Sequence, residues 1–271
     1  MNGAESMLQT LINNGVEVCF ANPGTSEMHM VAAMGKSDQI RSVLCLFEGV
    51  CSGAADGYGR MAGKPASTLL HLGPGLSNAS ANLHNAKKAG SPVINLVGDH
   101  ATYHKQYNAP LTSDILSLAR PISDWLQVAA SAAELPSCAA DAVYAANTKP
   151  GQVATLIVPA DAAWDPSINP ITTQPLASTP KVTREAVSGA ARLLTNSEPS
   201  ILFLGNMALT ERALALADQV VQATGAKLLS DTFIPRLARG EGRCSVERLG
   251  YFSEQAEQQV AGTKQWVMVG T

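Results

Sequence analysis

Short apolar, β-rich runs alternate with alanine-rich segments through the first 159 residues, and this alternation restricts the fold more than any other feature. A helix is predicted over 3–14, and strands are predicted over 16–20, 42–47, 68–72, 92–97 and 153–159. Strands separated by helices cannot pair as hairpins, so we expect a parallel sheet with helices on both faces. The sequence therefore predicts an α/β fold.

A proline-rich stretch interrupts this pattern and divides the chain. We predict a first domain over 1–165, a linker over 166–182 and a partial second α/β domain over 183–271. In the second domain we expect helices over 183–194 and 211–224, and strands over 201–204, 227–229 and 266–269. Fewer than a hundred residues follow the linker, so we expect this domain to be incomplete.

Composition excludes several classes of partner. The net charge is −3 and no basic run is longer than Lys87-Lys88, so a nucleic-acid partner is not expected. No signal peptide and no apolar stretch of the roughly 18 residues needed for a membrane span is present, so we expect a cytoplasmic protein without a membrane partner. The five cysteines form no CxxC pair, and they are interpreted as small buried side chains, not as a zinc site.

The first three predicted strands are each followed by an unusual loop, and in a parallel sheet such loops meet at one edge. After the first strand, Asn22 leads into a Pro23-Gly24 turn and the hydroxyls of Thr25 and Ser26. The conservative interpretation of this loop is a capped turn.

Glu48 directly follows four apolar residues, 44–47. A poorly solvated carboxylate favours its protonated form, which suits it to exchange a proton with a ligand. The alternative is a glutamate in the first turn of a helix, favoured there by the helix dipole.

His71 lies at the end of the third predicted strand, before a predicted Gly73-Pro74-Gly75 turn that lets the backbone approach a ligand. A single histidine is more often structural. Beside Glu48 it becomes a candidate proton shuttle or substrate contact.

These three loops together resemble the thiamine-diphosphate-dependent enzymes of the acetolactate synthase and benzoylformate decarboxylase group. The resemblance rests on Asn22-Pro23-Gly24, on Glu48 before the run 53–58, and on 73–75 followed by Asn78. It covers most of the first domain, which in that family binds the aminopyrimidine ring of the cofactor.

The resemblance implies a role for each matching residue. The residue that matches Glu48 hydrogen-bonds a ring nitrogen of the aminopyrimidine and so activates the cofactor for attack on a 2-oxo acid. The cofactor-binding residues implied are Pro23, Gly24, Glu48, Gly73, Pro74 and Asn78.

Substrate contacts are implied at Thr25, Ser26, His71 and His104, with Glu48 and His71 as the catalytic pair. A histidine at position 71 is typical of benzoylformate decarboxylase, whereas 73–75 is more typical of the synthases. Decarboxylation and carboligation therefore both stay open. His100 and His104 could suggest a metal site, but no third ligand has a suitable spacing, so no metal ligands are predicted in this chain.

The family binds the cofactor's diphosphate through Mg²⁺ and a Gly-Asp-Gly motif, which does not occur in this sequence. We therefore expect this chain alone to bind thiamine diphosphate poorly and to be inactive. FAD is not predicted, because Gly205-Asn206-Met207 is not a complete glycine-rich loop. In the complete enzyme the family's two-subunit site implies a homo-dimer or tetramer.

Two other functions stay open at this point. One is a non-catalytic or split module that pairs with a separate diphosphate-binding chain. The other is a nucleotide-binding α/β module without thiamine chemistry, which the fold alone would permit.

Overall fold

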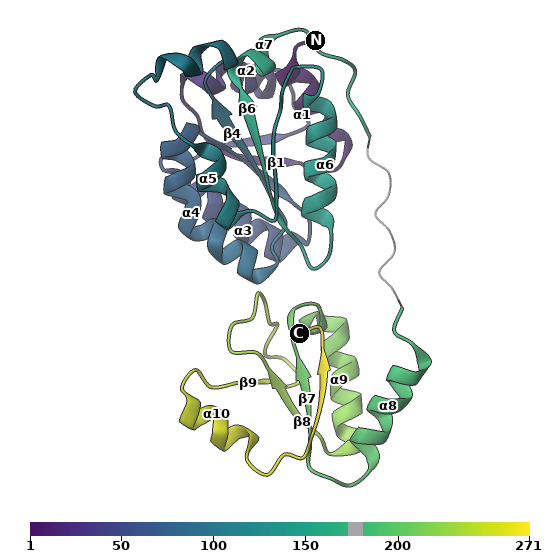
Figure 1. Ribbon diagram of the computed structural model, residues 1–271. Helices are drawn as coiled ribbons and strands as arrows, with labels where there is room; N and C mark the ends of the chain where they lie inside the picture. The colour runs from purple at the N-terminus through teal and green to yellow at the C-terminus, as the bar shows by residue number, and fades with distance from the viewer. Residues whose placement is uncertain (173–180) are drawn as a thin grey trace. The chain divides into compact units, whose positions relative to one another are not determined.

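The computed structural model describes residues 1–172 and 181–271, and the chain divides into two compact units, Met1–Ala177 and Ser178–Thr271 (Figure 1). Part of the predicted linker, 173–180, lies outside the described residues. The segment before it is attached to unit 1, since Ser6 Oγ donates to the carbonyl of Ile168 at 2.7 Å and Asn14 Nδ2 to that of Ile171 at 3.0 Å. The predicted boundaries at 165 and 182 stay predictions.

The elements of unit 1 follow one another in a βαβ pattern. Its helices are α1 (Gly3–Asn13), α2 (Met28–Gly35), α3 (Glu48–Ala62), α4 (Leu72–Ala89), α5 (Ile115–Ala119), α6 (Leu135–Asn147) and α7 (Ala160–Trp164). Its strands are β1 (Val18–Asn22), β2 (Arg41–Leu44), β3 (Ala66–Leu70), β4 (Val93–Asp99), β5 (Trp125–Val128) and β6 (Val153–Pro159). Its 3₁₀ segments within residues 1–172 are η1 (Thr25–Glu27), η2 (Thr102–Tyr107) and η3 (Arg120–Ile122).

The strands of unit 1 form one parallel sheet in the order β2-β1-β3-β4-β6-β5. The chain moves from β1 outward to β2 and then returns to the other side of β1, where Asn22 of β1 pairs with Leu70 of β3. The strand order therefore reverses between β1 and β3. Crevices at such reversals, beyond the carboxyl ends of the strands, are the usual ligand sites of open α/β sheets.

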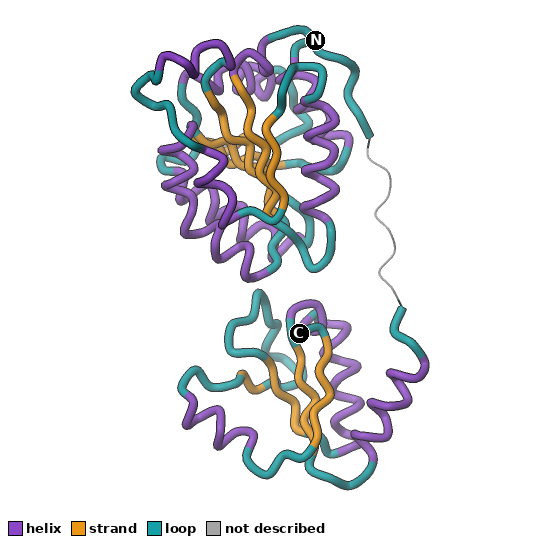
Figure 2. Tube along the Cα trace, in the orientation of Figure 1, coloured by secondary structure: helices purple, strands orange, loops and turns teal. Residues whose placement is uncertain are grey.

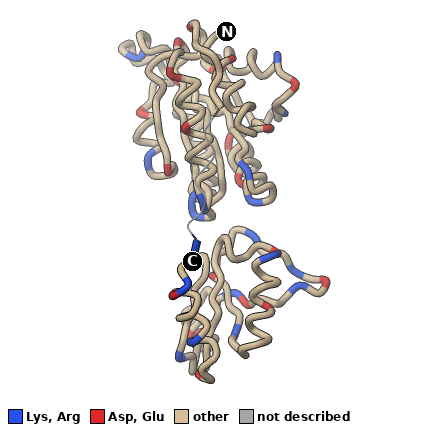
Figure 3. The backbone as a smooth tube through the Cα atoms, turned by 90° about the vertical axis from the view of Figure 1, so that its right-hand side faces the viewer, with Lys and Arg blue, Asp and Glu red and all other residues tan. Residues whose placement is uncertain are grey.

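Helices cover both faces of this sheet, which confirms the predicted fold class (Figures 1 and 2). On one face α1, α2, α6 and α7 pack their apolar side chains on the strands, and α3, α4 and α5 pack on the other face. Several Lys and Arg residues lie at the end of unit 1 opposite the N-terminus (Figure 3). The last turns of α3 and α4 hold Arg60, Lys87 and Lys88, which the helix dipole favours there.

The turn predicted at 73–75 is wrong. Gly73-Pro74-Gly75 is not a turn but lies in the first turn of α4, where the Gly75 N–H donates to the carbonyl of His71 at 2.7 Å. Pro74 fits there because the first turn of a helix has no intrahelical acceptor for its N–H groups, so a missing N–H costs nothing. The prediction of buried cysteines is confirmed for four of them, and Cys244 is half-buried.

Unit 2 is a smaller parallel α/β unit. Its elements are α8 (Arg184–Thr195), β7 (Ser200–Leu204), η4 (Asn206–Leu209), α9 (Glu211–Thr224), β8 (Lys227–Ser230), β9 (Glu247–Arg248), α10 (Ser253–Val260) and β10 (Gln265–Val269). The strand order is β10-β7-β8-β9. Among the helices of the described ranges, none is both long and apolar enough to cross a membrane.

Candidate active site

The loops after β1 and β2 are joined by a hydrogen bond. Asn22, the last residue of β1, donates from Nδ2 to the carbonyl of Cys45 at 2.7 Å, just beyond β2. After Pro23 and Gly24 the chain enters η1, so the hydroxyl-bearing loop is held beside the segment that leads to Glu48.

Glu48 is the first residue of α3 and is 8% exposed. Its Oε2 accepts a hydrogen bond from Asn78 Nδ2 of α4 at 2.9 Å. Its Oε1 lies against Gly75, where an added Cβ would be 3.1 Å away, and makes no hydrogen bond within the described residues. Glu48 is thus held between two helices with one oxygen satisfied and the other uncommitted.

His71 is the N-cap residue of α4, directly after β3. Its ring lies on Gly24, so closely that a Cβ at position 24 would overlap the ring atoms. His71 Nδ1 lies 2.7 Å from Glu27 Oε2, and the side chain is 22% exposed. The ends of β1 and β3 therefore meet at the crevice where the strand order reverses.

Glu27, the last residue of η1, is a further candidate that the sequence did not indicate. It is completely buried, and its Oε2 accepts from the Gly24 N–H at 2.7 Å as well as facing His71. Burial raises the pKa of this carboxyl, while the hydrogen bonds from Gly24 and His71 act in the opposite direction.

The signal for Glu27 in the sequence was weak. A glutamate three residues after a helix N-cap is the usual partner in a capping box, which does not indicate burial. The space for its carboxylate depends on Gly98 of β4, where an added Cβ would overlap Glu27 Oε1.

The other predicted residues are arranged less tightly. The hydroxyls of Thr25 and Ser26 form no hydrogen bond within the described part of the chain, and Thr25 is exposed. A Cβ at Gly73 would overlap the Ser113 side chain, whereas Pro74 is exposed.

His104, on η2, is exposed and contacts His100 and Tyr107 with ring centroids 5.5 and 5.7 Å away. It makes no contact with Glu48 or His71 among the described interactions, so the structure does not bring it into the group. Within residues 1–172 and 181–271, no cluster of three or more His, Cys, Asp or Glu side chains is arranged to hold a metal ion.

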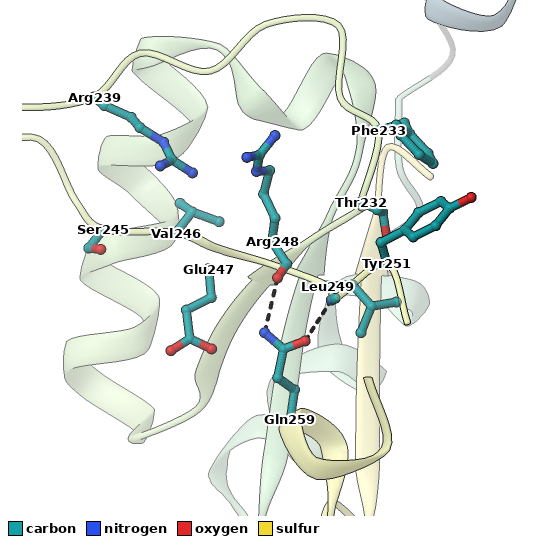
Figure 4. A pocket seen from close by; sticks show the side chains of 11 residues that line it. Thr232, Phe233, Arg239, Ser245, Val246, Glu247, Arg248, Leu249, Tyr251 and Gln259 are labelled. Atoms are coloured by element: carbon teal, nitrogen blue, oxygen red, sulfur yellow. Dashed lines mark hydrogen bonds between the residues drawn. The ribbon is translucent and has the colours of Figure 1, made fainter. Parts of the chain in front are cut away.

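A pocket of about 900 Å³ lies in unit 2 beside β9 (Figure 4). Its lining includes Arg239, Arg248 and Tyr251, and none of the predicted site residues. Gln259 is engaged in holding its wall, because it accepts from the Gly250 N–H at 2.7 Å and donates to the Arg248 carbonyl at 3.0 Å.

Comparison with known proteins identifies the family. Residues 1–118 match the family model described as thiamine pyrophosphate enzyme, N-terminal TPP binding domain. Residues 1–118 therefore form a thiamine pyrophosphate enzyme N-terminal domain, and proteins similar to the chain include acetolactate synthase and benzoylformate decarboxylase sequences. The predicted family is therefore confirmed, and Glu48, His71 and Glu27 all lie inside its matched domain.

Related proteins support the same family for this thiamine pyrophosphate enzyme domain. The chain is 48% identical over 270 residues to the Mycobacterium tuberculosis protein "Putative acetolactate synthase large subunit IlvX", covering 100% of this chain and 52% of that protein. It is 29% identical over 154 residues to the benzoylformate decarboxylase of Pseudomonas aeruginosa, which covers 56% of this chain and 27% of that enzyme.

The fold has a matching solved structure. The thiamine diphosphate-dependent 4-hydroxybenzoylformate decarboxylase of Rhodococcus jostii superposes with a TM-score of 0.87 at 21% identity, covering 100% of this chain and 52% of the other. The chain thus spans about half the length of the similar proteins that cover it completely.

Proposed function

We propose that this chain is the cofactor-activating part of a thiamine-diphosphate-dependent enzyme that decarboxylates a 2-oxo acid. The observation that carries the proposal is the Glu48 carboxylate, which is 8% exposed. One of its oxygens accepts a hydrogen bond from Asn78, and the other has no partner in the part of the chain that the structure describes. A purely structural carboxylate in the first turn of a helix has no need of a side-chain donor from a second helix.

The residues present fit an aminopyrimidine. A ring nitrogen that carries or shares a proton needs a fixed acceptor, and Glu48 Oε1 is available beside Gly75, which has no side chain to occupy that space. Asn78 fixes the plane of the carboxylate through Oε2. When bound, thiamine diphosphate supplies a nucleophilic ring carbon and the electron sink for decarboxylation.

In this proposal Glu48 exchanges a proton at Oε1 in a site that excludes most water. Pro23, Gly24, Gly73 and Pro74 form the wall next to the cofactor. His71, with the hydroxyls of Thr25 and Ser26, contacts the substrate, because a 2-oxo acid has a carboxylate and a carbonyl oxygen that accept hydrogen bonds.

Loss of CO₂ from a 2-oxo acid is common to decarboxylases and to acetolactate-forming carboligases, so the proposal applies to both. Similarity to a protein named as an acetolactate synthase supports carboligation, and similarity to benzoylformate decarboxylase supports transfer to a proton. We further propose that Mg²⁺ and a Gly-Asp-Gly motif outside this chain hold the diphosphate, and that the complete enzyme is a cytoplasmic homo-dimer or tetramer.

The first test is turnover of a longer protein that contains this chain and a Gly-Asp-Gly domain, measured as CO₂ release from pyruvate and from benzoylformate. Glu48→Gln should lower turnover by a factor of about 100 or more, as expected when a proton-transfer group is lost. Glu185→Gln is the matched control, because Glu185 also lies in the first turn of a helix, α8. If both substitutions lower turnover by the same small factor, Glu48 only stabilises the helix N-terminus and the proposal is refuted.

The second test is calorimetry with thiamine diphosphate and Mg²⁺. We expect the longer protein to bind and the 271-residue chain to bind poorly, because most of the cofactor's charge is on its diphosphate. Binding by neither protein would contradict the assignment.

A further inference from the structure

Glu27 is a buried carboxylate that none of the predicted roles uses. Within the described residues its side-chain hydrogen bonds involve one oxygen, Oε2. This oxygen accepts from the Gly24 N–H at 2.7 Å and lies 2.7 Å from His71 Nδ1. The other oxygen, Oε1, is buried and has no hydrogen-bond partner among the described residues. An ionised, fully buried carboxylate is costly unless hydrogen-bond donors compensate its charge. The free energy of the ionised form of Glu27 therefore depends on whether His71 Nδ1 carries a proton and donates it.

The geometry restricts how the two side chains can share protons. The Gly24 amide can only donate, so Oε2 must accept from it. When Glu27 is ionised, a neutral His71 ring must carry its proton on Nδ1, because otherwise the Nδ1 lone pair would face a carboxylate oxygen at 2.7 Å. Burial raises the pKa of Glu27, and donation from Nδ1–H is one of the contacts that oppose this rise.

Each of the two side chains packs closely against a glycine. The His71 ring lies on Gly24, and Glu27 Oε1 lies on Gly98, with an added Cβ overlapping its neighbour at both positions. Nδ1 is also the one nitrogen of His71 with a hydrogen-bond partner among the described residues, and the side chain keeps 22% exposure. Nε2 is therefore the nitrogen left for a ligand.

We propose that Glu27 is a positioning residue that fixes the neutral His71 ring as the Nδ1–H tautomer, so that Nε2 presents a lone pair to the site. His71 then acts as a proton acceptor or hydrogen-bond acceptor at Nε2. When Nε2 takes a proton, the carboxylate of Glu27 stabilises the imidazolium that forms. The role of Nε2 towards substrate rests on the proposed function, whereas the tautomer does not.

The decisive measurement uses the 271-residue chain with ¹⁵N-labelled histidine, at a pH above the last histidine titration. The ¹⁵N chemical shifts should show a pyrrole-type Nδ1 and a pyridine-type Nε2 for His71. His84, exposed on α4, is the reference within the same chain and should show the ordinary mixture of tautomers. The same mixture for His71, or a proton on Nε2, would overturn the proposal without any variant.

Two substitutions separate positioning from simple capping of η1. Glu27→Gln can keep an oxygen at the Oε2 position, so the Nδ1–H tautomer should persist. Glu27→Leu removes the acceptor, so the shifts of His71 should move to those of His84. Glu134→Leu is the matched control, since Glu134 also accepts from a backbone N–H, that of Ala130 at 3.3 Å, and contacts no histidine.

An unchanged tautomer in a folded Glu27→Leu chain would refute the positioning role. If that variant does not fold, the wild-type shifts and the Glu27→Gln shifts decide the question. The outcome is independent of turnover. If Glu48→Gln loses turnover but His71 is not the Nδ1–H tautomer, this inference alone is rejected. If His71 is the Nδ1–H tautomer but Glu48→Gln stays active, the proposed function alone is rejected.

Discussion

Gly24→Ala should distort the site without straining the backbone. Gly24 is extended, with φ −114° and ψ −160°, a conformation that alanine also adopts. The new methyl group would overlap the His71 ring, so the ring must shift and its bond to Glu27 must lengthen or break. Overpacking costs about 1–3 kcal/mol and a hydrogen bond to a charged group is worth about 1.5–3 kcal/mol. A shift of the His71 ring relieves the overpacking but weakens the hydrogen bond, so the two costs do not add in full. We therefore expect the free energy of unfolding to fall by about 2–4 kcal/mol.

Urea unfolding followed by the indole N–H signals measures this loss unit by unit, since Trp125 and Trp164 belong to unit 1 and Trp266 to unit 2. The signal of Trp266 should keep its midpoint. Gly57→Ala is the matched control, because Gly57 is exposed in α3 with open space around it, and alanine there should stabilise by about 0.5–1 kcal/mol. A Gly24→Ala chain as stable as the wild type, with unchanged His71 shifts, would refute the close contact.

Three further predictions concern burial. Burial raises the pKa of Cys19 to about 12, so at neutral pH a thiol reagent followed by mass spectrometry should modify half-buried Cys244 first and Cys19 only as unit 1 opens; the reverse order would contradict this. Thr155→Val removes the acceptor of a buried hydrogen bond from Asn95 Nδ2 at 3.0 Å. The free energy of unfolding of unit 1, measured with urea, should fall by about 1–3 kcal/mol. An unchanged urea midpoint would mean that this hydrogen bond does not contribute to stability. The pKa of Glu27 is raised in the folded state, so the protonated form of its carboxyl is favoured by folding. The free energy of unfolding of the wild type, relative to that of Glu27→Gln, should therefore be greatest below the ordinary pKa of glutamate and should fall as the pH rises through the raised pKa. An increase over this pH range would show that the pKa is lowered instead.

Much of the fold follows from local pattern. The predicted strand 153–159 has the same bounds as β6, and the predicted helix 211–224 has those of α9, because both have continuous apolar or amphipathic patterns ended by proline or glycine. β1 lies two residues later than predicted, at Val18–Asn22, since apolar spacing alone does not fix where sheet pairing begins. β5 was not predicted, as its four half-buried residues at the sheet edge give no clear alternation.

The sequence indicates some residues of the candidate site and not others. Glu48 could be found because it directly follows a continuous apolar run in the sequence. The reason for its burial differs from the expected one, because β2 ends at Leu44 and most of that run is exposed. The burial of Glu48 comes with its contacts to Asn78 and Gly75 of α4.

Glu27 could not be found from the sequence, because its burial depends on Gly98, which is distant in sequence and contributes only the absence of a side chain. The missing Cβ atoms at Gly24 and Gly98 make space for His71 and Glu27, and sequence patterns give no indication of which distant group uses such space.

Glu48 and Glu27 are both glutamates in a first helical turn, yet their surroundings favour different roles. Glu48 keeps 8% exposure and has an oxygen, Oε1, without a hydrogen-bond partner in the described residues, so that oxygen is available to a ligand. Glu27 is fully enclosed, with its one bonded oxygen occupied by Gly24 and His71, so no ligand can reach it. Any influence of Glu27 on a reaction must therefore pass through His71. A bound cofactor should perturb the carboxyl carbon signal of Glu48 by contact, and that of Glu27 only when a substrate engages His71.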